Sequence, residues 1–346
     1  MNCEAKSERT ISLAALTAGF DRPSSRFRIR QYISRLAEYG VNVRELTPFT
    51  DKTYYFPGPL KAMNRICSLL RSRDADMVWL SRGFVEGYET FERLLKRPRI
   101  LDVDDSVWLR GPFGRFTMPD IARSMDAVTA GNSYLADYFG RYCKNVHIVP
   151  TAVDLDKYTL RPEPKNEQRD RFVIGWTGSS SNFKYLDSIE PVLARFIRDY
   201  DRAELLLTAD RPWKYSLLPA EKVRFIPWSE EEEIGVLHSM SVGIMPLADD
   251  KWTRGKCAFK MLQYMAVGLP VIVSPVGVNR EVLDKGEVGL SAVSPDQWLE
   301  ALVSLYKDKS LEMKFGLAGR KVVEQFYNAD IITRDLADIF KSLVYR

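Results

Sequence analysis

The stretch from Gly255 to Ser274 constrains the fold of this chain more than any other part of the sequence. Its residues predict a charged loop, a helix with one apolar face that ends at Gly268, and a short apolar strand over Val271–Val273. A strand that is apolar on both faces is typical of the middle of a parallel sheet covered by helices. Such sheets bind ligands at the carboxyl ends of their strands, where helix N-termini favour phosphate. Because Lys256 precedes the expected helix, the segment favours an anion site.

Length and cysteine content favour a two-domain protein of a reducing compartment. A chain of 346 residues suits two domains of about 150 residues each. No apolar run reaches the roughly 18 residues that a membrane-spanning helix needs, and the polar first ten residues do not have the pattern of a signal peptide. The four cysteines form no CxxC pair and the chain has only two histidines, which argues against a zinc site or a disulfide framework. We therefore expect a cytoplasmic protein.

Basic residues are in excess only in the first half of the chain. Residues 1–150 carry 23 Lys and Arg against 17 Asp and Glu, a balance of +6 that leaves −2 for the remainder. Such a balance is typical of a solvated surface, but it would also suit an anionic substrate or peripheral contact with an anionic membrane at the inner face of the cell. The small excess and the lack of interleaved aromatic residues argue against a nucleic-acid partner.

Apolar strand patterns alternate with amphipathic helix patterns along the chain, which predicts an α/β fold with doubly wound parallel sheets. The clearest helix of the first half is expected over Ser25–Tyr39, where apolar residues form one stripe. The strands expected in the first half are Ile11–Ala18, Val41–Leu46, Met77–Leu80, Ile100–Val103, Ala127–Ala130 and Val146–Val149.

A charged, proline-containing stretch divides the chain. We expect residues 1–155 to form a first domain, residues 156–171 a linker, and residues 172–327 a second domain. The strands expected in the second half are Phe172–Trp176, Glu204–Thr208, Val223–Pro227, Val242–Met245 and Val271–Val273, and the helices are Ser181–Tyr200, Glu230–Met240, Pro295–Phe326 with a break, and Ile331–Tyr345. The last helix follows the final strand and must pack outside the second sheet.

Four sequence motifs occur along the chain, and both their order and their spacing are informative. They are the loop-to-helix junction Pro23–Ile29, the pair Ala127–Leu135 and Val146–Asp154, the glycine–serine segment Ile174–Lys184, and the block Gly255–Val282. They resemble, in turn, the serine- or glycine-rich loop of the first domain and the motifs "vTxSxxL…vIPNGVD", "GRL…KG" and "LEAMAxGxPVIxxxxGGxxEV" of the GT-B glycosyltransferases. The likeness is greatest to the family-4 group of retaining, nucleotide-sugar-dependent enzymes.

The resemblance implies two Rossmann-like domains that face a cleft, with residues 328–346 as a helix that crosses back to the first domain. The second domain would hold a UDP- or GDP-sugar as donor substrate and the first a glycan or lipid-linked acceptor. No cofactor is implied, and no metal bound through an Asp-x-Asp motif. The implied reaction is transfer of a hexose-type sugar to an acceptor hydroxyl with retention of configuration, in glycan or cell-surface polysaccharide synthesis.

The implied donor site departs from the family at three positions. Aligning Gly178 with the family glycine places Lys184 on the lysine position but Ser179 on the arginine position, and serine lacks the bidentate fork of a guanidinium. The two family glutamates fall on Gly255 and Gln263. Gln263 can accept a hydrogen bond from a ribose hydroxyl, or it could be an exposed helix residue. Gly255 would let the backbone approach the sugar phosphate.

Four further residues complete the expected donor site. Lys256 is the expected catalytic cation at the departing diphosphate, with Arg254 as the alternative, and either could instead be a solvated surface residue. Glu281 could contact the ribose or cap the N-terminus of its own helix. Trp228 ends a strand where the family grips the base, and core packing is its alternative role.

The first domain contributes the other candidates. Asp104 and Asp105 follow a buried strand, where one of them would orient the acceptor hydroxyl or accept its proton; helix capping by Asp105 is the alternative. The residues expected to contact an anionic acceptor or the diphosphate are Ser25, Arg26, Arg28 and Arg82.

Two other functions stay open. The loss of both family glutamates and of the arginine favours a catalytically weak or inactive GT-B scaffold or binding subunit. A nucleotide-sugar epimerase would need several cleft carboxylates and histidines, and the chain has only two histidines.

Overall fold

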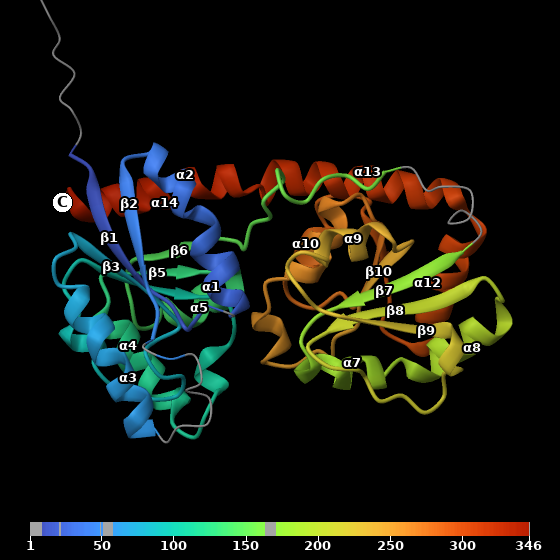
Figure 1. The fold of residues 1–346 in the computed structure, drawn as a ribbon, viewed down its shortest axis with the longest axis horizontal. Coiled ribbons are helices and arrows are strands. Elements are labelled where there is room, and N and C mark those ends of the chain that lie inside the picture. The colour runs from blue at the N-terminus through green and yellow to red at the C-terminus, as the bar shows by residue number, and fades with distance from the viewer. Residues whose placement is uncertain (1–8, 21, 49, 51–57, 163–170, 346) are drawn as a thin grey trace, which may run out of the picture. The chain divides into compact units, whose positions relative to one another are not determined.

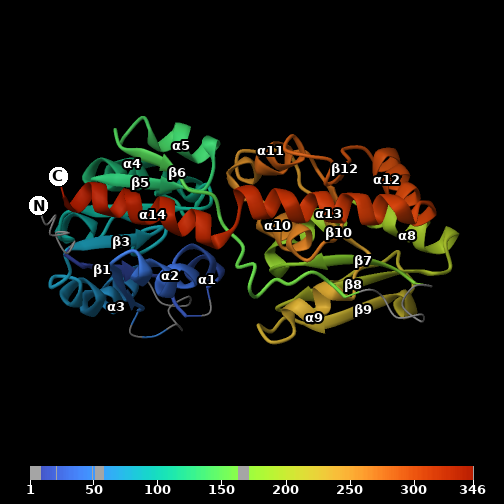
Figure 2. The same cartoon turned by 90° about the horizontal axis from the view of Figure 1, so that it is seen from above.

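The computed structural model describes residues 9–20, 22–48, 50, 58–162 and 171–345. Half of the expected linker, residues 163–170, lies outside these described ranges. The chain divides into two compact units (Figures 1 and 2). Unit 1 comprises Met1–Ala152, Gly255–Cys257 and Ala329–Arg346, and unit 2 comprises Val153–Arg254 and Ala258–Asn328.

A six-stranded parallel sheet with strand order β2-β1-β3-β4-β5-β6 forms the middle of unit 1. The strands are β1 (Ile11–Leu16), β2 (Val41–Leu46), β3 (Met77–Ser81), β4 (Arg99–Val103), β5 (Ala127–Ala130) and β6 (Val146–Ile148). All residues of β3, β4 and β5 are buried, which agrees with strands that are covered on both faces.

Helices cover both faces of this sheet. On one face α1 (Pro23–Arg28), α2 (Ile33–Glu38) and α14 (Ala329–Val344) pack over Leu13 and Trp79, and the Trp79 and Phe340 rings meet edge to face at 5.1 Å. On the other face, residues such as Leu16, Leu80 and Leu101 lie under three helices. These helices are α3 (Gly58–Arg71), α4 (Gly114–Ser124) and α5 (Ser133–Phe139).

Unit 2 contains a second six-stranded parallel sheet, with strand order β12-β11-β10-β7-β8-β9. The strands are β7 (Phe172–Thr177), β8 (Ala203–Ala209), β9 (Val223–Pro227), β10 (Val242–Met245), β11 (Val271–Val273) and β12 (Gly289–Ser291). The helices are α7 (Phe183–Asp187), α8 (Glu190–Asp199), α9 (Glu233–His238), α10 (Phe259–Ala266), α11 (Val278–Leu283), α12 (Pro295–Lys307) and α13 (Lys309–Phe326). Helices α8 and α12 pack over one cluster of sheet residues, and α9, α10 and part of α13 over the other.

The expected doubly wound parallel sheets are confirmed, and every expected strand is present within two residues of its predicted ends. The edge strand β12 was not predicted, because Gly289–Ser291 contains no apolar run that would indicate a strand. The expected break between Pro295 and Phe326 falls at Asp308, whose side chain accepts the backbone N–H of Ser310.

Three helix predictions were wrong in extent. The expected helix Ser25–Tyr39 is interrupted at Ile29 (φ −131°), and a short 3₁₀ segment, η1 (Arg30–Tyr32), separates α1 from α2. The turn there buries both Arg28 and Ile29. The expected helix Ser181–Tyr200 divides into η5 (Ser180–Asn182), α7 and α8, because Pro191 at the start of α8 favours a new helix there. The expected helix Glu230–Met240 is reduced to α9.

Candidate functional site

The loop after β7 is the first part of the candidate site, and it lies in unit 2. Gly178 has φ +152°, and its N–H donates to Thr208 O at 3.0 Å. A Cβ at this position would lie 2.4 Å from both Cε and Nζ of Lys260, whose Nζ is 4.2 Å from the centre of the Trp176 ring. The φ value therefore favours glycine here, and the missing Cβ leaves room for the ammonium group of α10 to approach the main chain after β7.

Serine side chains order the continuation of this loop. The Ser180 N–H and hydroxyl both donate to Asp210, at 2.6 and 2.7 Å. Burial by itself would raise the pKa of Asp210, but these two hydrogen bonds outweigh it and lower the pKa. Exposed Ser179, on the position of the family arginine, lies 3.1 Å from the Ser181 hydroxyl and accepts the Ser181 N–H. Lys184 is exposed on α7, with Nζ 5.0 Å from the Tyr185 ring centre.

Arg254 and Glu281 lie on the surface of unit 2. The exposed Arg254 guanidinium donates to both carboxylate oxygens of Asp249, at 2.6 and 3.2 Å. The backbone of Arg254 passes Gly277 so closely that a Cβ at Gly277 (φ +53°) would lie 2.8 Å from Arg254 O. Glu281 is exposed in the first turn of α11. The side chain that could replace the missing family arginine is thus already ion-paired.

Gln263 belongs to a buried polar network rather than to an exposed helix face. Its Nε2 donates to the Tyr158 hydroxyl at 2.8 Å and to Glu233 Oε1 at 3.1 Å. The Tyr158 hydroxyl donates to Glu233 Oε2 at 2.7 Å, and the indole N–H of Trp228 donates to Glu233 Oε1 at 3.2 Å. Glu233 is buried, whereas Trp228 is 43% exposed at the end of β9. Core packing of Trp228 is therefore wrong, and so is the exposed alternative for Gln263.

In unit 1 the structure places Arg28 in the interior. Its guanidinium donates to both carboxylate oxygens of Asp102, at 2.7 and 3.0 Å, and to Val149 O at 2.7 Å. Both side chains of the pair are almost fully buried. Burial by itself would lower the pKa of Arg28, but the Asp102 charge and hydrogen bond outweigh it and raise the pKa. Of its neighbours on α1, Ser25 is buried, and half-buried Arg26 lies 4.5 Å from the Phe27 ring centre.

Arg82 joins the two candidate aspartates of unit 1. Its Nε donates to Asp104 at 2.5 Å and its Nη2 to Asp105 at 2.8 Å. Burial favours the neutral form of both carboxyls, but the charges of Arg82 and Arg28 outweigh it at Asp104 and lower that pKa. At Asp105, burial and the adjacent Asp104 charge together raise the pKa. The Asp105 carboxylate thus binds Arg82, and the short helix that follows has no side-chain cap.

The main chain of Arg82 is itself unusual. Its φ is +60°, a region that residues other than glycine seldom occupy. Its N–H donates to Asp102 O at 2.8 Å, so the strained residue is anchored to β4. Backbone strain of this kind is concentrated at functional sites, which supports the cluster of Arg82, Asp104 and Asp105 as a working part of unit 1.

Residues Gly255–Cys257, which carry Lys256, are also part of unit 1. The Asn132 side-chain amide donates to Gly255 O and Lys256 O at 3.1 and 3.2 Å, and the Cys257 thiol donates to Asp104 O at 3.2 Å. A Cβ at Gly255 would lie 2.1 Å from the Ser106 hydroxyl oxygen, so glycine is required. The half-buried Lys256 acts on Asp105 electrostatically, since its charge favours the ionised carboxylate.

The structure therefore gathers the predicted residues into two groups. Lys256, Asp104, Asp105 and Arg82 lie in unit 1, and the Gly178 loop and Trp228 lie in unit 2. Sequence reasoning missed Lys260 and Glu233. The signal for Lys260 was its place in the first turn of the helix expected after Lys256. Glu233 gave no signal, because its partners come from three other segments.

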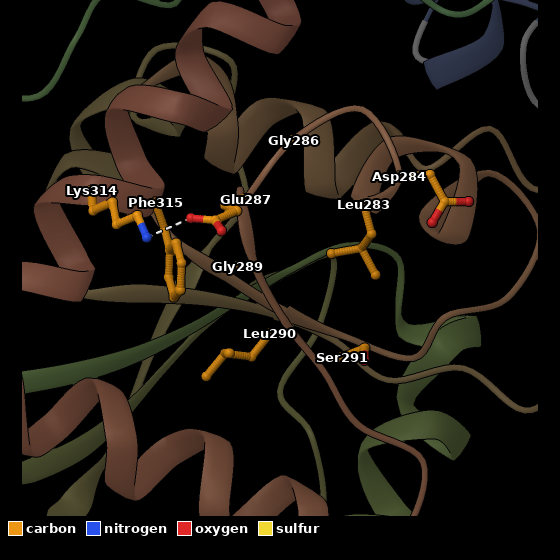
Figure 3. A pocket seen from close by; sticks show the side chains of 9 residues that line it. All are labelled: Leu283, Asp284, Gly286, Glu287, Gly289, Leu290, Ser291, Lys314 and Phe315. Carbon is orange, nitrogen blue, oxygen red and sulfur yellow. Dashed lines mark ion pairs between the residues drawn. The ribbon is translucent and has the colours of Figure 1, made fainter.

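Unit 2 also has a surface pocket of about 610 Å³, and none of the candidate residues lines it. Figure 3 shows Phe315 beside the ion pair of Lys314 and Glu287, whose Nζ and Oε2 atoms are 2.5 Å apart. Its lining comes from the end of α11, the following loop, β12 and α13.

Neither a bilayer-spanning helix nor a metal-ligand cluster is found in the part of the chain that the structure describes. No helix there is both long and apolar enough to cross a membrane. Within the same residues, no three His, Cys, Asp or Glu side chains are grouped as they would be around a metal ion.

Comparisons with known proteins agree with this architecture. Residues 171–308 match the family model described as glycosyl transferases group 1. The GDP-mannose-dependent alpha-(1-6)-phosphatidylinositol monomannoside mannosyltransferase of Mycobacterium tuberculosis is 24% identical over 319 residues, which cover 84% of this chain and 81% of the relative.

Two solved structures have the same fold over nearly the full length. Sucrose-phosphate synthase from Thermosynechococcus elongatus superposes with a TM-score of 0.73 at 14% identity, covering 96% of this chain and 99% of that protein. Anabaena HepE in complex with UDP-glucose superposes with a TM-score of 0.71 at 12% identity, covering 96% and 100%. The family match over residues 171–308 and the shared fold show a glycosyltransferase with a GT-B, family-4-like fold.

Proposed function

We propose that this glycosyltransferase moves a hexose-type sugar from a nucleoside-diphosphate sugar to an acceptor hydroxyl with retention of configuration. The observation that carries the proposal is the position of Lys260, whose ammonium group lies beside Gly178 after β7. A departing diphosphate gains negative charge in the transition state, and a lysine beside a glycine-opened main chain supplies a cation where a phosphate can approach.

The donor is assigned to unit 2. The diphosphate would lie against the Gly178 loop and Lys260, with Ser179 and Lys184 as further contacts. The base would lie against the Trp228 ring, and Gln263, Arg254 and Glu281 stay donor-site proposals in unit 2. Gly255, which belongs to unit 1, stays a separate donor-site proposal. The Mycobacterium relative is named for its use of GDP-mannose and the Anabaena structure contains UDP-glucose, so we propose GDP- or UDP-sugars as donors.

The acceptor is assigned to unit 1. The bond from the anomeric carbon to the diphosphate oxygen breaks, and its electron pair leaves with the diphosphate. A bond from that carbon to the acceptor oxygen forms on the same face of the sugar, and the acceptor proton passes to Asp105. A raised pKa makes the Asp105 carboxylate a better proton acceptor than an ordinary aspartate. Arg82, which is itself held by Asp104, fixes the Asp105 carboxylate in position. Lys256 balances the negative charge that develops on the diphosphate.

We further propose that transfer requires no metal ion or other cofactor, since lysines meet the leaving-group charge and Arg82 occupies both aspartates. Transfer should then persist in EDTA. The acceptor is proposed to be a glycan or a lipid-linked sugar, in keeping with the phosphatidylinositol monomannoside named for the relative. The basic excess of residues 1–150 adds contact with an anionic membrane to the proposal.

The test is turnover of a panel of UDP-, GDP- and ADP-sugars, followed by NMR of the product anomer. Retention of configuration with one nucleotide class is the expected result. Lys256→Ala should lower turnover at least about tenfold, whereas the exposed Lys251→Ala serves as the matched control. Tight nucleotide binding without turnover of any donor would instead support a binding subunit, which the replacement of both family glutamates by Gly255 and Gln263 favours.

A further inference from the structure

Helix α3 turns its polar side chains toward the interior of unit 1. The buried Arg65 guanidinium donates to Phe84 O at 3.1 Å and Thr17 O at 2.5 Å. The buried Ser68 hydroxyl donates to Thr47 O at 2.9 Å. An ordinary surface helix buries an apolar stripe and exposes its charges. On its inward face this helix buries Leu69 in the apolar core, but it also buries Arg65 and Ser68, which donate hydrogen bonds to loop carbonyl groups.

The outward face of α3 is apolar. Leu60, Met63, Ile66 and Leu70 are between 37% and 62% exposed, and Cys67 beside them is also exposed. The four apolar residues follow helical spacing and form one stripe, about 15 Å long. Figures 1 and 2 show α3 as an outer layer of unit 1. A contiguous exposed stripe of this kind, on a helix that buries only Leu69 among its large apolar residues, marks a surface that binds an apolar partner.

The charges around this stripe indicate which partner it fits. Apart from the buried Arg65, the charged residues of the segment 58–73 are Lys61, Arg71 and Arg73, and the segment contains no Asp or Glu. The next acidic residues, Asp74 and Asp76, are ion-paired with Arg44 and Arg9. An apolar stripe on a helix that carries cations and no acidic residue is the pattern of a helix that lies in the interface of an anionic bilayer. A symmetric dimer through the same stripe would bring these cations against one another.

We propose that the outward face of α3 is the surface by which the chain binds an anionic lipid bilayer, with Leu60, Met63, Ile66 and Leu70 inserted among the lipids. The inference rests on the membrane contact in the proposed function, and it identifies the outward face of α3 as the place of that contact. Vesicle binding needs no donor, so it can fail or succeed independently of sugar transfer.

The experiment is flotation of the full chain with phosphatidylcholine vesicles, with and without phosphatidylglycerol. The wild type should float only with the anionic vesicles, and less as salt rises. The double variant Met63→Gln and Leu70→Gln should lower the partition coefficient about tenfold or more, because it removes the apolar residues that insert. The pair Arg71→Gln and Arg73→Gln should lower it about fivefold for each charge removed.

The matched control is Met313→Gln with Leu317→Gln, which removes an equally exposed apolar pair from α13 and should leave flotation unchanged. Donor hydrolysis measured without vesicles should be the same in all variants, which shows that they fold. Two results would overturn the proposal: no flotation of the wild type with either vesicle, or equal flotation of the wild type and Met63→Gln/Leu70→Gln. The proposal would likewise be overturned if light scattering showed a wild-type dimer that this variant dissociates, because the stripe would then be the contact with a second copy of the chain.

Discussion

The Glu233 carboxylate accepts the indole N–H of Trp228 at 3.2 Å and thereby fixes a half-exposed ring at the end of β9. Glu233 is held in turn by Tyr158 and Gln263, at 2.7 and 3.1 Å. A buried carboxylate that accepts three hydrogen bonds is rigid, so the ring it holds presents a preorganised flat surface. Gln263, which replaces the second family glutamate, thus helps to hold the carboxylate that supports the Trp228 ring.

Nucleotide affinity should depend on the Trp228 ring. Base stacking on an aromatic side chain contributes about 1–3 kcal/mol, so Trp228→Ala should weaken GDP or UDP binding about tenfold or more, measured by titration calorimetry. Trp228→Phe keeps a ring and should lose less. Glu233→Gln should fall between the two, because the ring remains but its anchor is weakened. Equal affinities of wild type and Trp228→Ala would remove this ring from the donor site.

Lys260 should matter more for turnover than Lys184. Loss of one preorganised donor at a developing charge costs about 2.7–4 kcal/mol, or a hundredfold or more in kcat, and Lys260→Met should show a loss of this order. Lys184→Met removes the same charge from an exposed position and should cost less than tenfold. Donor hydrolysis at saturating substrate distinguishes them. The assignment fails if the two substitutions have the same effect.

The buried pair of Arg28 and Asp102 should contribute to stability more than to affinity for anions. Asp102→Leu leaves an uncompensated buried guanidinium and should lower the free energy of unfolding by about 3–5 kcal/mol, measured with urea. Arg28→Met combined with Asp102→Leu should recover much of that loss, since no charge stays buried. A double variant less stable than Asp102→Leu alone would contradict this account.

Thiol reactivity should follow burial and pKa. Burial raises the pKa of Cys257 to about 12, and it raises the pKa of Cys143 as well. Both thiols therefore stay protonated at pH 8, and iodoacetamide should label exposed Cys67 first in a Cys3→Ser background. The raised pKa of Cys257 adds stability below its unfolded value of about 8.5, and that contribution is lost as pH rises toward 12. Mass spectrometry that finds Cys257 labelled as fast as Cys67 would refute the assignment.

The sheets could be predicted from the sequence, whereas several site residues could not. Runs such as Val271–Val273 are apolar on both faces, and only a covered parallel strand accommodates them. The role of Arg28 depends on a partner 74 positions away, and a sequence shows charge but not such pairing. The role of Glu233 could not be predicted for the same reason. A predicted apolar stripe is also assumed to face inward, but in α3 only Leu69 does so, whereas Met63 and Leu70 are exposed.

The edge-to-face contact of Phe340 with Trp79 has a consequence for synthesis of the chain. One face of the first sheet is covered in part by α14, which leaves the ribosome more than 180 residues after β6. Until then Trp79, Ile11 and Leu13 lack part of their covering, so unit 1 completes its fold only after unit 2 has been translated. An expression fragment that stops at Ala152 should accordingly aggregate unless residues 329–345 are supplied with it.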